Sequence, residues 1–228
     1  MGLLEDFLDG QQHSFLVAHG GLLYPADHMG TRWRQMFKGI YPGSFNPVHQ
    51  DHINVHKAAE MQLGGKVAYE ISVVNADKGN LTADEVLDRL NQTPLINDDV
   101  YVFITKASLF REKMSLFPHT TVIMGADTFE RFLDPKYLRK SFDFFGQPIV
   151  YNAQADEYLL QRQLEDMTTL GCSVIVAERN GKTLDSVIES SAVPWYNHRR
   201  QFHKLINYQP IGLSSTAIRA GEQQPFSY

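Results

Sequence analysis

Short apolar runs alternate with amphipathic segments along most of the chain, beginning at Phe37. The apolar runs predict buried β-strands, over residues 37–41, 67–74, 100–105, 120–124 and 173–177. The amphipathic segments predict helices, over residues 51–63, 83–91, 108–117, 127–133 and 157–170, with a last helix from Ser214. Strands separated by helices are typical of a parallel sheet, because each crossover lays a helix against it. The pattern therefore predicts an α/β fold, a Rossmann-like doubly wound parallel sheet with helices on both faces.

The first 36 residues do not share this pattern. Leu3, Leu4, Phe7 and Leu8 stand at helical spacing and predict a short helix. Glycine and proline residues then interrupt the segment, which predicts an irregular arm. Two parts are therefore expected, an N-terminal arm over residues 1–36 and one α/β domain over residues 37–228.

Composition is that of an ordinary globular protein. Of the 228 residues, 43% are apolar, and 21 basic against 26 acidic residues give a net charge of −5. The acidic total disfavours nucleic acid as a partner, and no apolar run is long enough to suggest a membrane partner. The acidic start of the chain lacks the basic segment of a signal peptide, so a cytoplasmic location is expected. The single cysteine, Cys172, excludes an internal disulfide and a cysteine-based metal cluster, and no feature indicates an oligomeric state.

The segment GIYPGSFNPVHQDH, residues 39–52, follows the first strand of the alternating pattern. Ligands bind at the carboxyl ends of the strands in such sheets, so chemistry is expected in this loop. Gly43 and Ser44 allow the backbone to approach a ligand closely. His49 and His52 stand three apart at the start of a helix, where they share a face. Free amides and the helix dipole at such a start also suit a phosphate.

Three interpretations of this loop are open from the residues alone. The first is a tight turn that carries surface histidines. The second is a metal site, since His49, His52 and His56 fall on one helical stripe, although no acidic or cysteine ligand completes the set. The third is a phosphate-binding site formed by imidazoles and backbone amides.

Three segments resemble the nucleotidyltransferase superfamily, which includes the nicotinamide and nicotinate mononucleotide adenylyltransferases and the cytidylyltransferases. GSFNPVHQDH at residues 43–52 resembles its first signature, which ends in His or Thr, any residue, Gly and His. MGAD at residues 124–127 resembles the family's Gly-x-Asp, and GLSSTAIR at residues 212–219 resembles its C-terminal Ile-Ser-Ser-Thr-x-x-Arg element. The resemblance covers roughly residues 37–221. One departure is Asp51, which stands where the signature usually has Gly.

This resemblance implies a reaction in which a phosphate oxygen of one substrate attacks the α-phosphorus of a nucleoside triphosphate and pyrophosphate leaves. It implies catalytic roles for His49, His52 and Arg219. The nucleotide-binding residues that it implies are Gly43, Ser44, Phe45, Asp127, Ser214, Ser215 and Thr216. Magnesium would arrive with the nucleoside triphosphate, so no metal site made by the protein itself is expected.

The resemblance leaves the donor and the acceptor open. We expect transfer of AMP from ATP to a mononucleotide such as nicotinamide mononucleotide, so that the partners are a nucleoside triphosphate and a phosphorylated small-molecule acceptor. The alternatives are a cytidylyltransferase that uses CTP and a phosphorylated alcohol, and a nucleotide-binding regulatory module that has lost turnover. Lys57, Lys78 and Lys106 are candidate phosphate contacts that also fit ordinary surface lysines.

Overall fold

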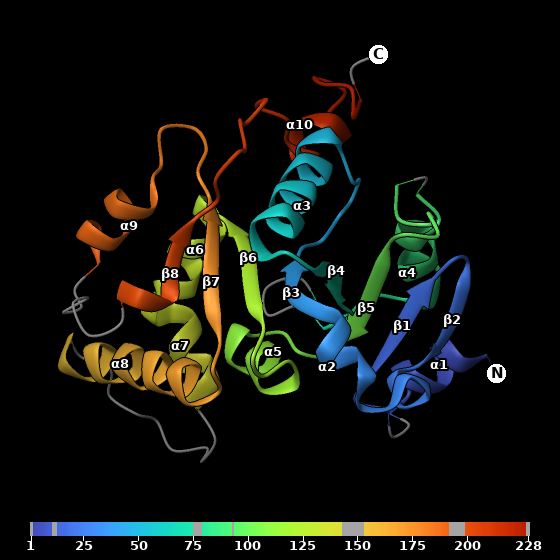
Figure 1. Cartoon of the computed structure of the whole chain (residues 1–228), viewed down its shortest axis with the longest axis horizontal. Helices are drawn as coiled ribbons and strands as arrows, with labels where there is room; N and C mark the ends of the chain where they lie inside the picture. The colour runs from blue at the N-terminus through green and yellow to red at the C-terminus, as the bar shows by residue number, and fades with distance from the viewer. Residues whose placement is uncertain are drawn as a thin grey trace. The chain divides into compact units, whose positions relative to one another are not determined.

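The chain forms strands and helices that Figure 1 labels in their order along the sequence. The computed structural model describes residues 2–10, 13–74, 79–92, 94–142, 153–191 and 199–226. The chain divides into two compact units, one formed by Met1–Ser108 with Ile206–Tyr228 and the other by Leu109–Leu205. The first unit is therefore built from two stretches of sequence, and the second unit is inserted between them.

The strands of the first unit have the order β2-β1-β5-β4-β3. They are β1 (Phe15–His19), β2 (Leu22–Pro25), β3 (Phe37–Pro42), β4 (Lys66–Ser72) and β5 (Tyr101–Thr105). The helices are α1 (Leu3–Leu8), α2 (Trp33–Met36), α3 (Gln50–Leu63), α4 (Ala83–Leu90) and α10 (Ser215–Arg219), with a 3₁₀ segment at Ala26–Arg32. β3, β4 and β5 run parallel, whereas β1 is antiparallel to both of its neighbours, β2 and β5. In this order α3 and α4 make two successive strand–helix–strand crossovers.

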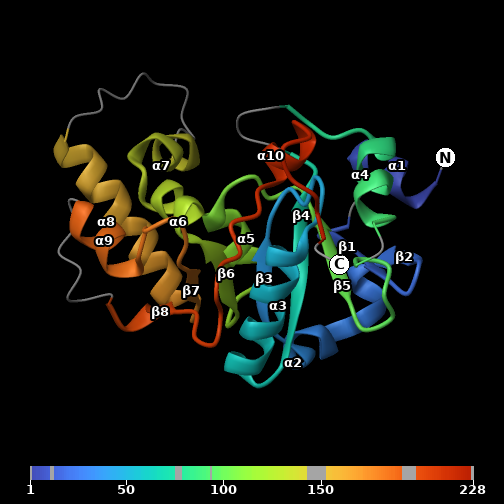
Figure 2. The ribbon, with the colours of Figure 1, turned by 90° about the horizontal axis from the view of Figure 1, so that it is seen from above.

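Local sequence explains where these two helices begin and end. α3 packs on β3 and β4 and ends at Gly64, whose φ of 61° lies in the left-handed region that glycine adopts without strain. α4 begins with a capping box, in which Thr82 and Glu85 satisfy each other's backbone amides. α4 also contacts α1, and the two lie side by side in Figure 2.

The predicted irregular arm is wrong for residues 15–25, because β1 and β2 form a hairpin there that joins the sheet along β5. Its two-residue turn is Gly20-Gly21, with φ of 55° and 73°, and such positive values at both positions match the twist of paired strands. The helix at Leu3–Leu8 agrees with its prediction. The sheet is consequently mixed instead of purely parallel, and the Phe15 ring packs edge-on against Trp33.

The second unit has its own parallel strands in the order β6-β7-β8. They are β6 (Thr121–Gly125), β7 (Ser173–Ala177) and β8 (Phe202–Lys204), and a 3₁₀ turn at Arg199–Gln201 precedes β8. The helices are α5 (Phe110–Leu116), α6 (Ala126–Leu133), α7 (Pro135–Phe142), α8 (Ala153–Thr169) and α9 (Leu184–Ser190). Among these elements, α7, α9 and β8 have no counterpart in the sequence-based prediction. The rings of Phe129, Phe132 and Phe202 pack together in the core of this unit.

The predicted α/β class is confirmed, because mostly parallel strands are joined by helical crossovers and flanked by helices, as in a Rossmann-like fold. The predicted strands and the longer predicted helices fall within a few residues of the observed ones; β7, for example, has the predicted bounds. None of the helices in the described ranges is long and apolar enough to cross a membrane.

Candidate functional site

The loop between β3 and α3, residues 43–49, is fastened at both ends and in the middle. The Gly43 amide donates to the carbonyl oxygen of Glu70, which prolongs the pairing of β3 with β4. The side-chain amide of Gln92 then holds the middle of the loop, since its Nε2 donates to the Phe45 carbonyl at 2.8 Å and its Oε1 accepts from the Val48 amide at 2.6 Å. A single side chain thus fixes two backbone groups of the loop.

Phe45 turns its side chain back beneath the loop. Its φ is 44°, in the left-handed region, and its side chain is buried. The ring packs edge-on against the rings of Tyr41, His52 and Tyr69. A Cβ at Gly43 would lie 2.5 Å from Cζ of Phe45, which is closer than atoms pack. Packing of the Phe45 ring therefore explains why a glycine stands at position 43, which the sequence alone did not reveal. Ser44, beside it, is exposed.

His49 and His52 lie together at the start of α3, as their spacing predicts. Their rings stack with centroids 3.7 Å apart and planes 20° apart. The His49 amide donates to Nδ1 of His52 at 3.3 Å, so the second ring also helps to cap the helix. His49 is buried and His52 is half-buried. The first turn of α3 therefore presents two imidazoles as a pair.

His56, the third histidine of the stripe, belongs to the core. Its ring stacks on Tyr69 at 4.4 Å, Nε2 donates to the Val67 carbonyl at 2.7 Å, and Nδ1 lies 3.8 Å from a carboxylate oxygen of Glu60. Burial lowers the pKa of His56, against the opposing effect of Glu60. With its ring stacked on Tyr69 and Nε2 bonded to the backbone of β4, His56 does not extend the pair. Within the described residues, no group of three or more His, Cys, Asp or Glu side chains is arranged to hold a metal ion.

The C-terminal motif, residues 212–219, contacts the loop at residues 43–49. The Ser215 hydroxyl donates to the Pro47 carbonyl at 2.9 Å. The Arg219 guanidinium donates to the Asn46 carbonyl and, at 3.3 Å, to the hydroxyl of Thr216. The structure thus brings together two of the three motifs, which stand more than 160 residues apart in the chain, and α10 lies near the start of α3 in Figure 1.

The segment that follows α10 holds the motif in place. Gln223 accepts from the Ser214 amide at 2.9 Å and donates to the Gly212 carbonyl at 3.1 Å. The Pro225 carbonyl accepts from the Gln50 amide in the first turn of α3, at 3.0 Å. The Ser214 side chain makes no capping hydrogen bond to α10. One backbone amide at the start of α3 is therefore already bonded within the protein.

Asp51 occupies the position where the family signature usually has Gly, and its contacts explain how the site accommodates it. The side chain is buried, with 3% of its surface exposed. One carboxylate oxygen accepts from the Tyr208 hydroxyl at 2.9 Å and from the Ile211 amide at 3.4 Å. Asp51 therefore ties the segment before α10 to the first turn of α3.

Asp127 lies in the first turn of α6, in the second unit. Its carboxylate accepts from the Arg179 guanidinium at 2.8 and 3.0 Å and lies 3.0 Å from Nζ of Lys182. Burial alone would raise the pKa of Asp127, but the hydrogen bonds from Lys182 and Arg179 outweigh it, so the pKa lies below its usual value. The ion pairs that hold Asp127 lie within its own unit, and its contact with a nucleoside stays a prediction.

The three candidate lysines have different surroundings. Lys57 is exposed on α3. Lys106, after β5, places its ammonium 4.7 Å from the centroid of the Phe7 ring of α1, so it contacts the N-terminal helix. Lys78 lies outside the described residues. None of the three is a confirmed phosphate contact.

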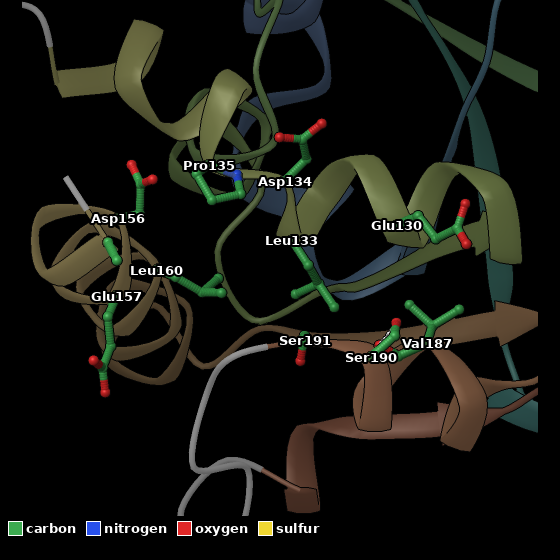
Figure 3. A pocket seen from close by; sticks show the side chains of 11 residues that line it. Glu130, Leu133, Asp134, Pro135, Asp156, Glu157, Leu160, Val187, Ser190 and Ser191 are labelled. Atoms are coloured by element: carbon green, nitrogen blue, oxygen red, sulfur yellow. Dashed lines mark hydrogen bonds between the residues drawn. The ribbon is translucent and has the colours of Figure 1, made fainter. Parts of the chain in front are cut away.

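The second unit contains a cavity of about 470 Å³, shown in Figure 3. Apolar side chains of Leu133, Leu160 and Val187 line it together with acidic residues that include Glu130 and Asp156. Partners are already present for some of these acids, since Glu130 pairs with Lys182 and Asp156 with Arg139. The sequence did not indicate this cavity, because α7 and α9, which contribute to its wall, were not predicted.

Several residues that hold the segments of the candidate site in place escaped the sequence-based prediction, among them Gln92, Tyr208 and Gln223. Each acts on a segment distant in the chain or through a side chain that no motif includes, so spacing gave no signal for it.

Comparisons with known proteins add no assignment: no family model matches the chain, and no curated protein matches it.

Proposed function

We propose that the protein is a magnesium-dependent nucleotidyltransferase, which transfers AMP from ATP to a mononucleotide such as nicotinamide mononucleotide and releases pyrophosphate. The observation that carries the proposal is the contact between the loop at residues 43–49 and α10 through Ser215 and Arg219. This contact gathers two imidazoles, two hydroxyls and a guanidinium in one unit, and these are groups that bind phosphates.

The reaction needs alignment and charge stabilisation more than a nucleophile. An oxygen of the acceptor phosphate forms a bond to the α-phosphorus of ATP, the bond from that phosphorus to the bridging oxygen breaks, and pyrophosphate leaves with the electron pair. The stacked rings of His49 and His52 would donate to the triphosphate, and Arg219 would bind the departing phosphates. The Ser214 to Thr216 segment would supply amides and hydroxyls at the start of α10.

Magnesium would enter this site bound to the nucleoside triphosphate. The carboxylate nearest the histidines in sequence, Asp51, is committed to Tyr208 and Ile211. The loop at residues 43–49 contains no carboxylate, and its polar side chains, Ser44, Asn46 and His49, are neutral groups that attract magnesium less than charged phosphate oxygens do. When bound, the ion would neutralise charge on the phosphates, and the chain's own groups would position them.

A panel of nucleoside triphosphates and phosphorylated acceptors, assayed by pyrophosphate release, tests the proposal. ATP with a mononucleotide should give turnover. Turnover with CTP and a phosphorylated alcohol instead would indicate the cytidylyltransferase alternative. His52→Ala should lower kcat by roughly 100-fold or more, as loss of one charge-stabilising donor does elsewhere. The matched control is His203→Ala, an exposed histidine of the second unit, which should leave turnover unchanged.

The inactive nucleotide-binding module is the second candidate, and Asp51 favours it. Its buried carboxylate stands where the signature usually has Gly, next to the histidines that turnover would need. A module of this kind would bind ATP, release no pyrophosphate with any acceptor, and show no effect of His52→Ala on turnover. A kcat loss of less than about threefold in an active protein would contradict the role of His52.

A further inference from the structure

The Asp51 side chain lies in the first turn of α3, between the paired histidines, but it contacts the C-terminal stretch of the first unit. One carboxylate oxygen accepts from the Tyr208 hydroxyl at 2.9 Å and from the Ile211 amide at 3.4 Å. In the last turn of α3, the side-chain oxygen of Gln62 accepts from the Ile206 amide at 2.9 Å. The segment before α10 therefore follows α3 from its last turn to its first.

This attachment ends one residue before the C-terminal motif. Gly212 follows directly, and its carbonyl and the Ser214 amide are both bonded to the side chain of Gln223. The motif then contacts backbone carbonyls of the loop at residues 43–49 through Ser215 and Arg219. Asp51 thus connects the turn that carries the imidazoles with the segment that carries the guanidinium and the hydroxyls.

Burial makes this connection important. A carboxylate that is 3% exposed has lost most of its hydration, and burying such a group is costly unless hydrogen-bond donors replace the water. The Tyr208 hydroxyl and the Ile211 amide are those donors. Both come from the segment before the motif, so the position of that segment and the position of Asp51 depend on each other.

We infer that Asp51 is a positioning residue, which holds the C-terminal motif so that Arg219 and Ser215 meet a phosphate bound beside the histidines. The inference rests on the proposed function, which supplies that phosphate as part of the nucleoside triphosphate. Asp51 acts through its hydrogen bonds to the protein and not through contact with a substrate. Because a misplacement of about 1 Å can cost an enzyme about 100-fold in rate, loss of this hold should weaken both binding and turnover.

Two substitutions at this position separate the hydrogen bonds from the charge. Asp51→Asn and Asp51→Ala both remove the negative charge, but asparagine keeps an oxygen that accepts hydrogen bonds. Calorimetry with inorganic pyrophosphate and the full chain, below the unfolding temperature of each variant, should show binding weakened by about tenfold in Asp51→Ala and by less than about threefold in Asp51→Asn. A carboxylate that merely repels phosphate predicts tighter binding in both variants. The matched control is Asp88→Ala, at an exposed aspartate of α4, which should bind as the wild type does.

Tyr208→Phe tests the same hydrogen bond from the other side and leaves the charge of Asp51 in place. It should weaken pyrophosphate binding in the same direction, and the double variant with Asp51→Ala should bind no more weakly than Asp51→Ala alone. In steady-state kinetics both single variants should raise KM for ATP and leave KM for the acceptor unchanged. A purely structural residue would lower the thermal midpoint and leave the KM and Kd of the folded protein unchanged. If Asp51→Ala does not fold, Tyr208→Phe alone decides.

The outcomes separate this inference from the proposed function. A pyrophosphate Kd in Asp51→Ala within about twofold of the wild-type value, equal weakening in Asp51→Asn, or no pyrophosphate binding by the wild-type chain overturns the inference. Turnover gained in Asp51→Ala also overturns it and identifies the carboxylate as the cause of lost activity. Pyrophosphate binding that depends on Asp51, in a chain that turns over no nucleotide, supports the inference and refutes the proposed function.

Discussion

The hydrogen bond between Tyr208 and Asp51 allows the most direct prediction from the structure, which is the stability lost when this bond is removed. The Tyr208 hydroxyl donates to a buried carboxylate oxygen at 2.9 Å, and the other donor to that oxygen, the Ile211 amide, is more distant at 3.4 Å. Tyr208→Phe removes the closer donor and leaves the ring in place. A hydrogen bond to a charged group contributes about 1.5–3 kcal/mol, so the free energy of unfolding should fall by an amount in this range.

Urea denaturation followed by circular dichroism measures the change, and hydrogen exchange at residues 206–214 localises it to the first unit. At about 2–4 °C for each kcal/mol in a domain of this size, the thermal midpoint should fall by about 3–12 °C. Asp51→Ala and the double variant complete a cycle in which the two single losses should not add, because both remove the same bond. A Tyr208→Phe loss below about 0.5 kcal/mol, or fully additive single losses, would refute the reasoning.

Two other substitutions follow from packing and burial. Gly43→Ala should lower the free energy of unfolding by about 1–3 kcal/mol in urea denaturation, because its Cβ would meet the enclosed Phe45 ring; the control Gly125→Ala, whose Cβ would meet only Arg179 at 3.8 Å, should cost less, and equal losses would contradict this. The pKa of His56 is lowered by burial, so the stability that the neutral ring provides is complete above its usual value of 6.5 and is lost as pH falls below it. His56→Gln should flatten the decline of the unfolding free energy between about pH 6.5 and 5, and the exposed-histidine variant His28→Ala should keep it; an unchanged slope in His56→Gln would show that other groups cause the decline.

The sequence predicts those parts of the fold that depend on local pattern. The run at residues 173–177 is apolar throughout and becomes β7, and the amphipathic segment before it becomes α8. The hairpin of β1 and β2 was missed although its Gly20-Gly21 turn is a strong local signal, because the short strands beside it have weak alternation. β8 was missed for a related reason: it has three residues and depends on pairing with β7.

The candidate site also has features that local sequence predicts and features that depend on tertiary contacts. The stacking of His49 on His52 follows from their spacing on one helix, so it could be predicted. The sequence could not predict that His56 is separate from that pair, because the position of its ring depends on Tyr69 and Val67 of the neighbouring strand β4. The role of Gln92 is also long-range, since it lies more than 40 residues from the backbone groups that it holds. Local patterns therefore found the groups of the site, whereas tertiary contacts decide their neighbours.

The insertion of the second unit into the first has a consequence for how the protein is made. Asn46 and Arg219, which contact each other, are separated by 173 positions. At a synthesis rate of about 5–20 residues per second, Arg219 follows Asn46 from the ribosome by about 9–35 seconds. During that time the loop at residues 43–49 exists without Ser215 and Arg219, while the whole of the second unit is made. A chain that is released early, or cut after residue 205, would keep the paired histidines and lose Arg219, which bonds to the loop at Asn46.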